Sequence, residues 1–265
     1  MRYYVVSDIH GFYTPMRKAL DDAGFFTDTE PHKLIVCGDM LDRGSEVLEM
    51  QKFMCELLDR NELIFIRGNH EDLMVSMLDN FDEYEWNIAL GSSHHNHNGT
   101  WESALYLSDM TEIEALTNSE KFIARVKASP FYSKLIPASI NYFETDNYIF
   151  IHGWIPCSTD KMPSWYRKNR NYKFDPNWRD ADSGSWDDAR WFNGMELAEL
   201  HGVTEPDKKI VCGHWHASYG HAVFEKKGTE FNLGADFTPY FGNGVIAVDA
   251  CTACTGFVNC LVIDD

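Results

Sequence analysis

The chain has 265 residues, of which 44% are hydrophobic, so it can bury a large core as one elaborated domain or as two small ones. Its 41 acidic and 23 basic residues give a formal net charge of −18 at pH 7. This balance argues against nucleic acid or an anionic membrane as a partner, because no basic stripe is present to displace counterions. No run approaches the ~20 apolar residues of a membrane span.

The cysteines and the first residues bear on the cellular compartment. The chain has seven cysteines, an odd number, and no basic segment followed by an apolar one, the pattern of a signal peptide, is visible. We therefore expect free thiols in a reducing cytoplasm. Cys251 and Cys254 form a CxxC motif, but without a second such pair they do not predict a zinc site.

The first predicted strand, 3–6, runs into the polar sequence Ser7-Asp8-Ile9-His10-Gly11. If the backbone stays extended here, Asp8 and His10 lie on the same side of the strand and Ile9 turns into the core. A carboxylate and an imidazole side by side at a strand end are candidate metal ligands.

Two more apolar strands are predicted at 33–37 and 62–66, and each also ends in a polar cluster. The first runs into Gly38-Asp39-Met40-Leu41-Asp42-Arg43-Gly44 and the second into Arg67-Gly68-Asn69-His70-Glu71. A carboxylate directly after a strand, such as Asp39, can hold a metal ion, and the planar guanidinium of Arg43 suits a phosphate.

Helical segments are predicted between and after these strands. Thr14 is expected to cap the first helix, with Pro15 in its first turn. Apolar residues recur at helical spacing over 46–58, and a third helix is expected to include 73–78. The alternation of strand, polar cluster and helix predicts an α/β fold with its site along the carboxyl ends of the strands.

A longer segment at about 79–130 interrupts this alternation and is expected to form a helical cap over the site. Within it, 101–107 and 113–126 are predicted to be helical, and 92–99 is predicted to be a polar loop. The loop contains three histidines that we expect to be solvated rather than bound to metal, since no carboxylate or cysteine flanks them at ligand spacing: His94, His95 and His97.

A second insertion, at about 157–193, is rich in aromatic and arginine side chains. Such a mixture occurs in surfaces that bind single-stranded nucleic acid. In so acidic a chain, a lid packed over the site is the better interpretation.

The remaining predicted strands follow the same rule. Strand 148–151 runs into His152-Gly153, and strand 209–212 ends before Gly213-His214-Trp215-His216. Segments 245–248 and 257–263 are expected to pair antiparallel around a turn at 252–256. We expect one domain over 1–265, carrying the two insertions.

Five strand ends thus supply imidazole, carboxylate and amide groups. This donor set suits Mn, Fe, Zn, Ni or Co rather than Ca, and the lack of cysteine disfavours a structural zinc site. The donors are too many for one ion and fit two ions that share a carboxylate. Such a pair lowers the pKa of a bridging water, so that hydroxide attacks a phosphorus atom in line with the leaving group.

These blocks resemble the signature of the calcineurin-like metallophosphoesterases, and within them the phosphoprotein phosphatase group. They are Asp8-Ile9-His10-Gly11, Gly38 to Gly44, Arg67 to Glu71, His152-Gly153 and Gly213 to His216. The ending Phe241-Gly242-Asn243-Gly244, with Asp249 after it, matches more loosely. The bacterial and phage-type serine/threonine phosphatases, and the relatives that cleave diadenosine tetraphosphate symmetrically, look most similar.

The resemblance implies a four-layer αββα sandwich and a role for each motif residue. One metal ion would be held by Asp8, His10 and Asp39, with His216 as a further ligand, and the other by Asp39, Asn69, His152 and His214. His70 would be the general acid, oriented by Asp42. Arg43 and Arg67 would hold phosphate oxygens, and Arg190 is a candidate to join them.

The expected activity is a metal-dependent phosphatase reaction on phosphoserine or phosphothreonine in proteins, or on a small phosphoester. One alternative is a dinucleoside polyphosphate hydrolase or other nucleotide phosphodiesterase, which an aromatic slot among Trp165, Trp186 and Trp191 would favour. A less favoured alternative is a metal-binding module without catalysis. Manganese is the metal expected to support activity in vitro.

Overall fold

The computed structural model describes residues 1–159 and 171–265, and its strands form two main sheets and a small one. The first sheet has the order β11-β1-β2-β3 and the second the order β4-β5-β8-β10-β9. The strands of the first sheet are β1 (Arg2–Val6), β2 (His32–Cys37), β3 (Leu63–Ile66) and β11 (Leu261–Asp264). Those of the second are β4 (Phe143–Glu144), β5 (Tyr148–Phe150), β8 (Lys209–Cys212), β9 (Tyr240–Phe241) and β10 (Val245–Ala247). The small sheet pairs β6 (Ser158–Thr159) with β7 (Tyr172–Lys173).

The central strands of both sheets are parallel, and antiparallel strands lie at the edges. In the first sheet β1, β2 and β3 run in one direction, and β11 runs against β1. In the second sheet β5, β8 and β10 are parallel, while β4 and β9 are antiparallel to their neighbours. The carboxyl ends of parallel strands therefore come together at one edge of each sheet.

Alternating side chains of the central strands enter two different cores. Tyr3 and Val5 of β1 pack between the two sheets, whereas Tyr4 and Val6 pack under the helices that cover the first sheet. In β8, Val211 faces the space between the sheets, and Ile210 packs under the helices of the other side. Strands buried on both faces in this way read as continuous apolar runs in the sequence.

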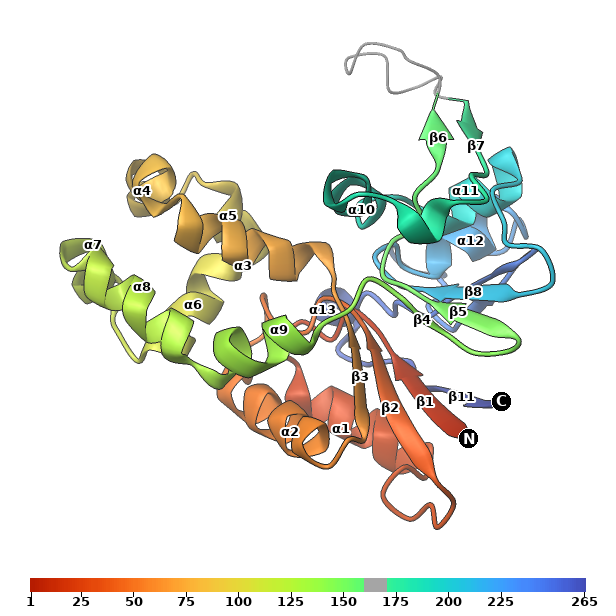
Figure 1. Ribbon diagram of the computed structural model, residues 1–265, viewed down its shortest axis with the longest axis horizontal. Coiled ribbons are helices and arrows are strands. Elements are labelled where there is room, and N and C mark those ends of the chain that lie inside the picture. Colours follow the sequence, from red (N-terminus) through yellow and green to blue (C-terminus); the bar gives the residue numbers. More distant parts are fainter. Residues whose placement is uncertain (160–170) are drawn as a thin grey trace.

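Helices cover the outer face of each sheet, so the molecule has four layers: helices, sheet, sheet and helices (Figure 1). Those that share a core with the first sheet are α1 (Tyr13–Asp22), α2 (Val47–Asp59), α3 (Asn69–Asp79), α4 (Phe81–Ala89), α6 (Thr100–Ser108), α7 (Glu112–Thr117), α8 (Ser119–Ala128), η1 (Phe131–Leu135) and α9 (Ile136–Ala138). The second sheet packs with η3 (Trp178–Asp180), α10 (Ser183–Ala189), α11 (Gly194–His201) and α12 (Ser218–Val223). The α/β class predicted from the sequence is confirmed, and the arrangement of the layers is consistent with the predicted four-layer sandwich.

The predicted pairing of the last two strands is wrong. β10 lies in the second sheet, parallel to β8, whereas β11 pairs antiparallel with β1 in the first sheet. The connection between them includes the short helix α13 (Thr252–Thr255), and it crosses from one sheet to the other (Figure 1). Each strand thus completes a different sheet, and the two termini lie beside each other at β1 and β11.

The polar stretch at 92–99 is not the loop predicted from its composition, and of its three histidines, expected to be solvated, only His94 and His97 are exposed. Residues His94–Asn98 form the short helix α5, and the His95 side chain is fully buried, with its ring 4.6 Å from that of Tyr84 between centroids. Burial, and then the neighbouring His94, lower the pKa of His95 to about 4. The ring is therefore neutral at pH 7, and among the described residues neither of its nitrogens has a hydrogen-bond partner.

Two smaller expectations also differ. Thr14 is not the cap of the first helix, because α1 begins at Tyr13 and the Thr14 hydroxyl and amide both donate to Glu46. Pro15 does lie in the first turn. The segment predicted as one helix over 113–126 is two, α7 and α8, separated by Asn118, whose side chain caps α8. No helix in residues 1–159 and 171–265 has the length and apolar character needed to cross a bilayer.

Candidate metal centre

The polar clusters that follow the strands converge on one cavity of 140 Å³. Its lining consists of Asp8, His10, Asp39, Arg43, Asn69, His70, Asn98, Trp191, His214, His216, Asp249 and Cys251. Side chains from both sheets and from both insertions meet there. The convergence predicted from strand ends is therefore present in the structure.

An extended backbone was expected at these strand ends, but the structure shows a different conformation. Asp8 and His10 both have φ of 51°, and Asp39 has φ of 53°, which places all three in the left-handed region. A non-glycine residue held there costs on the order of 1–3 kcal/mol. The strain is held by backbone hydrogen bonds between the two loops, such as that from the His10 amide to the Asp39 carbonyl at 3.0 Å. Ile9 is nevertheless buried in the core, as predicted.

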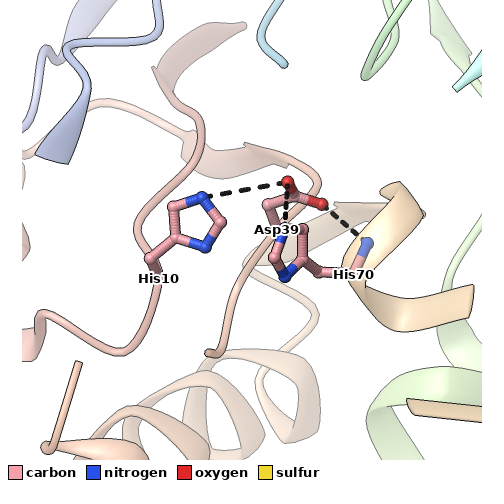
Figure 2. Close-up of side chains that lie close together, drawn as sticks. All are labelled: His10, Asp39 and His70. Carbon is pink, nitrogen blue, oxygen red and sulfur yellow. Dashed lines mark hydrogen bonds and ion pairs between the residues drawn. The ribbon is translucent and has the colours of Figure 1, made fainter. Parts of the chain in front are cut away.

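Asp39 lies at the centre of the cluster. Its Oδ2 is 3.9 Å from His10 Nε2 and 3.7 Å from His70 Nε2, and Figure 2 shows the two rings close to this carboxylate. Its Oδ1 is 3.3 Å from His152 Nε2. Ligand atoms of Asp39, His10 and His70 lie within 4.8 Å of one another, and the same holds for Asp39, His152 and His214. Asp39 thus belongs to both donor groups.

Backbone carbonyls orient two of the rings. His152 Nδ1 donates to the carbonyl of Cys37 at 2.8 Å, and His10 Nδ1 donates to that of Leu41 at 3.1 Å. With Nδ1 held in this way, the Nε2 atom of each ring faces Asp39. Histidines that bind metal ions are oriented in the same way in other proteins.

The surroundings of the cluster lower the pKa of two of its histidines, the buried His10 and the half-buried His214. Burial, reinforced by nearby positive groups, lowers the pKa of His10 well below its usual value and that of His214 to about 3. Neutral imidazole is the form that binds a metal ion. Burial also opposes ionisation of Asp39, but the surrounding imidazoles outweigh it and hold the pKa of this carboxyl below its ordinary range. The neutral rings of His10 and His214 beside the anionic Asp39 carboxylate form a donor set that fits divalent ions.

Glu71 is a functional residue that the sequence reasoning did not single out. Its buried carboxylate accepts three backbone N–H groups, from Gly68 at 2.7 Å and from Asp39 and Met40 at 3.0 Å each. Glu71 therefore holds the turn that presents Asp39. A glutamate at the third position of a helix whose N-cap is Gly68 is a recognisable capping signal, so the sequence did contain the clue.

Comparison with known proteins identifies the family. The model for calcineurin-like phosphoesterases matches residues 1–242. The chain belongs to this family. It is 23% identical over 225 residues to an asymmetrical bis(5′-nucleosyl)-tetraphosphatase, PrpE, of Bacillus velezensis, with 83% of this chain and 73% of that protein covered. It is 32% identical over 119 residues to serine/threonine-protein phosphatase 2 of Escherichia coli, with 45% and 47% covered. A crystal structure of a cold-active protein-tyrosine phosphatase shares the fold, with a TM-score of 0.50, 16% identity and coverage of 99% of this chain and 73% of the other.

Phosphoesterases of this family use divalent metal ions, and the two overlapping groups of histidine and aspartate around Asp39 fit such ions. Three further predicted ligands lie in or beside these groups. Asp8 accepts the His214 amide at 2.9 Å, and Asn69 Oδ1 lies 2.7 Å from His152 Nε2. His216 lines the cavity, but its Nδ1 is hydrogen-bonded to Ser218 and its Nε2 lies 3.7 Å from Glu230.

His70 and Asp42 form a buried pair in this phosphoesterase. His70 Nδ1 lies 2.7 Å from Asp42 Oδ2. Burial lowers the pKa of His70, but Asp39 and the hydrogen bond with Asp42 raise it more, to about 9. The direction of this shift favours the protonated ring, the form that a general acid needs. The proximity of Asp42 to His70 that the resemblance implied is present.

The helical cap reaches this pair through α6. The Thr100 hydroxyl donates to Asp42 Oδ2 at 2.8 Å, and the Ser103 hydroxyl accepts the Asp42 amide at 2.9 Å. Gly99, just before α6, lies so close to Arg43 that a Cβ at this position would overlap the Arg43 backbone. The cap therefore fixes the position of Asp42. No motif in the insertion had indicated this role.

Replacing Thr100 by valine is expected to lower kcat by roughly tenfold, because Asp42 loses a hydrogen bond to its charged oxygen. The loss should be larger for glycerol phosphate than for p-nitrophenyl phosphate, since the alkoxide needs the proton more. Steady-state kinetics on both substrates measure it. Thr100→Ser should keep most of the activity; a loss as large as that of Thr100→Val would contradict a role for the hydroxyl.

The predicted phosphate-binding arginines take different positions. Arg43 lines the cavity, with Nη1 2.9 Å from His10 Nε2 and Nη2 3.2 Å from His70 Nε2. Arg67 and Arg190 instead both form ion pairs with Asp72, and neither lines the cavity. Their contact with phosphate stays a prediction.

The aromatic slot proposed from the sequence is only partly described. Trp165 lies outside the described residues. Trp186 is buried and stacks on Tyr142, with ring centroids 5.7 Å apart. Trp191 is half exposed and lies at the cavity, edge-on to His214 at 5.7 Å.

Cys251 also lines the cavity; burial and then Asp249 raise the pKa of its thiol to about 12, so it is not an ionised nucleophile at pH 7.

Proposed function

We propose that this protein hydrolyses phosphoesters with two divalent metal ions that share Asp39. Asp8, His10 and Asp39, with His216, would hold one ion, and Asp39, Asn69, His152 and His214 would hold the other. The observation that carries this proposal is the membership of Asp39 in both groups of donor atoms. The five motifs found in the sequence supply every proposed ligand.

The chain's own residues account for the remaining steps. When bound, the metal pair would lower the pKa of water and stabilise charge on the phosphate oxygens. His70 holds the proton that the leaving oxygen needs, and Asp42 keeps its ring oriented through Nδ1. Arg43 is placed to bind a phosphate oxygen in the cavity, where cationic groups offset the net charge of −18.

Two substrate classes are candidates for this site. The similarity to serine/threonine-protein phosphatase 2 supports phosphoserine or phosphothreonine in proteins as one substrate class. A second candidate, nucleotides or dinucleoside polyphosphates, is supported by the similarity to the bis(5′-nucleosyl)-tetraphosphatase and by a specific observation. An aromatic cavity adjoins the metal centre through Trp191.

Removal and return of metal tests the proposed reaction. Protein stripped with EDTA is expected to lose hydrolysis of p-nitrophenyl phosphate and to recover it with Mn²⁺, because water without metal has a pKa far above 7 and is a poor nucleophile. The same titration with Zn²⁺, Co²⁺, Ni²⁺ and Fe²⁺ compares the metals. Lack of turnover with every ion, in protein that binds two of them, would favour a metal-binding module without catalysis.

A further inference from the structure

A second cavity, of 210 Å³, lies beside the metal centre and shares Trp191 with it. Its walls include four aromatic side chains and two polar ones: Tyr172, Trp191, Phe192, Trp215, Asn193 and Glu196. A group that fills this cavity while its phosphate lies at the metal centre would pass over the Trp191 ring. The two cavities together therefore suit a substrate with a flat ring on one side of its phosphate.

The position of Trp191 is fixed by the fold. Its amide donates to the Asp188 carbonyl at 3.1 Å, and the Arg190 amide before it donates to Trp186 at 3.1 Å. Its ring lies edge-on to His214, at an interplanar angle of 86°, yet half of the residue's surface is exposed. An exposed indole held beside a metal-ligand histidine is a preformed surface for stacking.

The polar side chains in this cavity have unused hydrogen-bonding groups. Asn193 is 92% buried, since its exposed fraction is 8%; its Oδ1 accepts the Glu196 amide, and its Nδ2 has no partner among the described residues. The Glu196 carboxylate likewise has no hydrogen bond or ion pair within the described part of the chain. An unpaired buried donor is costly, and native proteins usually satisfy it.

We propose that this cavity binds the base of a nucleotide substrate, a base that carries an exocyclic amino group. The base would stack on Trp191, its amino group would donate to Glu196, and a ring nitrogen would accept from Asn193. This inference rests on the proposed phosphoester hydrolysis and names the substrate class of that site. A phosphopeptide side chain fits less well, because the rings of Phe and Tyr carry no amino group for the Glu196 carboxylate.

Hydrolysis of adenosine 5′-monophosphate and of ribose 5-phosphate by the Mn²⁺-loaded protein tests the proposal, since the two differ only in the base. The ratio of their kcat/KM values is expected to be roughly 5 to 150, the range that stacking on one aromatic ring supports. Trp191→Leu should bring the ratio close to one, and Trp191→Phe should keep part of the preference. Trp86→Leu, the same change at an exposed tryptophan of α4, should leave the ratio unchanged.

The amino-group contact has its own comparison. Inosine 5′-monophosphate carries a carbonyl where adenosine 5′-monophosphate carries the amino group, so the wild type should prefer the latter by at least about tenfold. Glu196→Ala should remove this discrimination. Equal kcat/KM for both nucleotides in the wild type would overturn the Glu196 contact.

Binding of adenosine to EDTA-treated protein, measured by calorimetry, separates this proposal from the catalytic one. Adenosine should bind without metal, and Trp191→Leu should weaken it by roughly 5- to 150-fold. If no phosphoester is hydrolysed but adenosine binds, the proposed function fails and the base site stands. The base site would be overturned if the wild type preferred adenosine 5′-monophosphate over ribose 5-phosphate by less than about twofold. It would also be overturned if hydrolysis of a phosphoserine peptide depended on Trp191 while adenosine did not bind.

Discussion

Replacing Asp39 by asparagine is expected to remove both metal ions and to lower kcat/KM by at least ~10³. Asp39 is the one carboxylate found in both donor groups, and no neighbouring side chain replaces the charge that the imidazoles of these groups surround. Loss of the ions removes several kcal/mol of stabilisation of the developing negative charge. Metal content by mass spectrometry and kinetics on p-nitrophenyl phosphate measure the two effects.

The fold should survive this substitution. Asparagine has the shape of aspartate, and its Oδ1 can still accept the His70 amide, which donates to Asp39 at 3.0 Å. Asp22→Asn, at an exposed carboxylate that pairs with Lys18 on α1, is the matched control and should keep full metal content. An Asp39→Asn protein with normal metal content and turnover would contradict the shared-ligand account.

Replacing His70 by asparagine is expected to spare the metal content and to lower kcat by about 10²–10⁴ for alkyl phosphates, the usual contribution of a general acid. The loss should be smaller for p-nitrophenyl phosphate, whose leaving group needs no proton. The geometry behind this expectation is the 2.7 Å contact of His70 Nδ1 with Asp42, which orients the ring.

Metal content distinguishes two roles for His70, because its Nε2 also lies within the donor group of His10 and Asp39. If His70 is the acid, His70→Asn binds two ions; if it is a ligand, the variant loses one. His97→Asn, at an exposed histidine of α5, is the matched control and should change neither quantity. Equal losses for aryl and alkyl phosphates would argue against the general-acid assignment.

Much of the site could be predicted because its residues come directly after the buried strands in the sequence. Buried strands of parallel sheets have apolar runs that stop at their carboxyl ends, and the polar residues after β1, β2, β3 and β8 stand out for that reason. The path of the backbone there could not be predicted. Asp8, His10 and Asp39 adopt the left-handed conformation only because contacts between distant loops hold it.

Other features depend on tertiary contacts that local patterns do not contain. His95 looks solvated in sequence, and it is buried because α5 packs beside α3 and α6. The segments that became β10 and β11 have the pattern of a hairpin, but each pairs with a strand far away in the chain. Thr100 and Trp191 belong to insertions with no motif, and only the fold brings them to Asp42 and His214.

Volume alone would also have missed the site. A larger cavity, of 540 Å³, lies between α2 and the turn from α6 to α7 and contains none of the proposed ligands. The 140 Å³ cavity is identified by its chemistry: buried carboxylates and imidazoles with shifted pKa values and oriented rings.

A crystal structure of the Mn²⁺-loaded protein, with anomalous diffraction measured for manganese, tests the central claim most directly. The account predicts two anomalous peaks that both contact the Asp39 carboxylate, one beside His10 and the other beside His152 and His214. A single peak, or two peaks of which neither contacts Asp39, would contradict it.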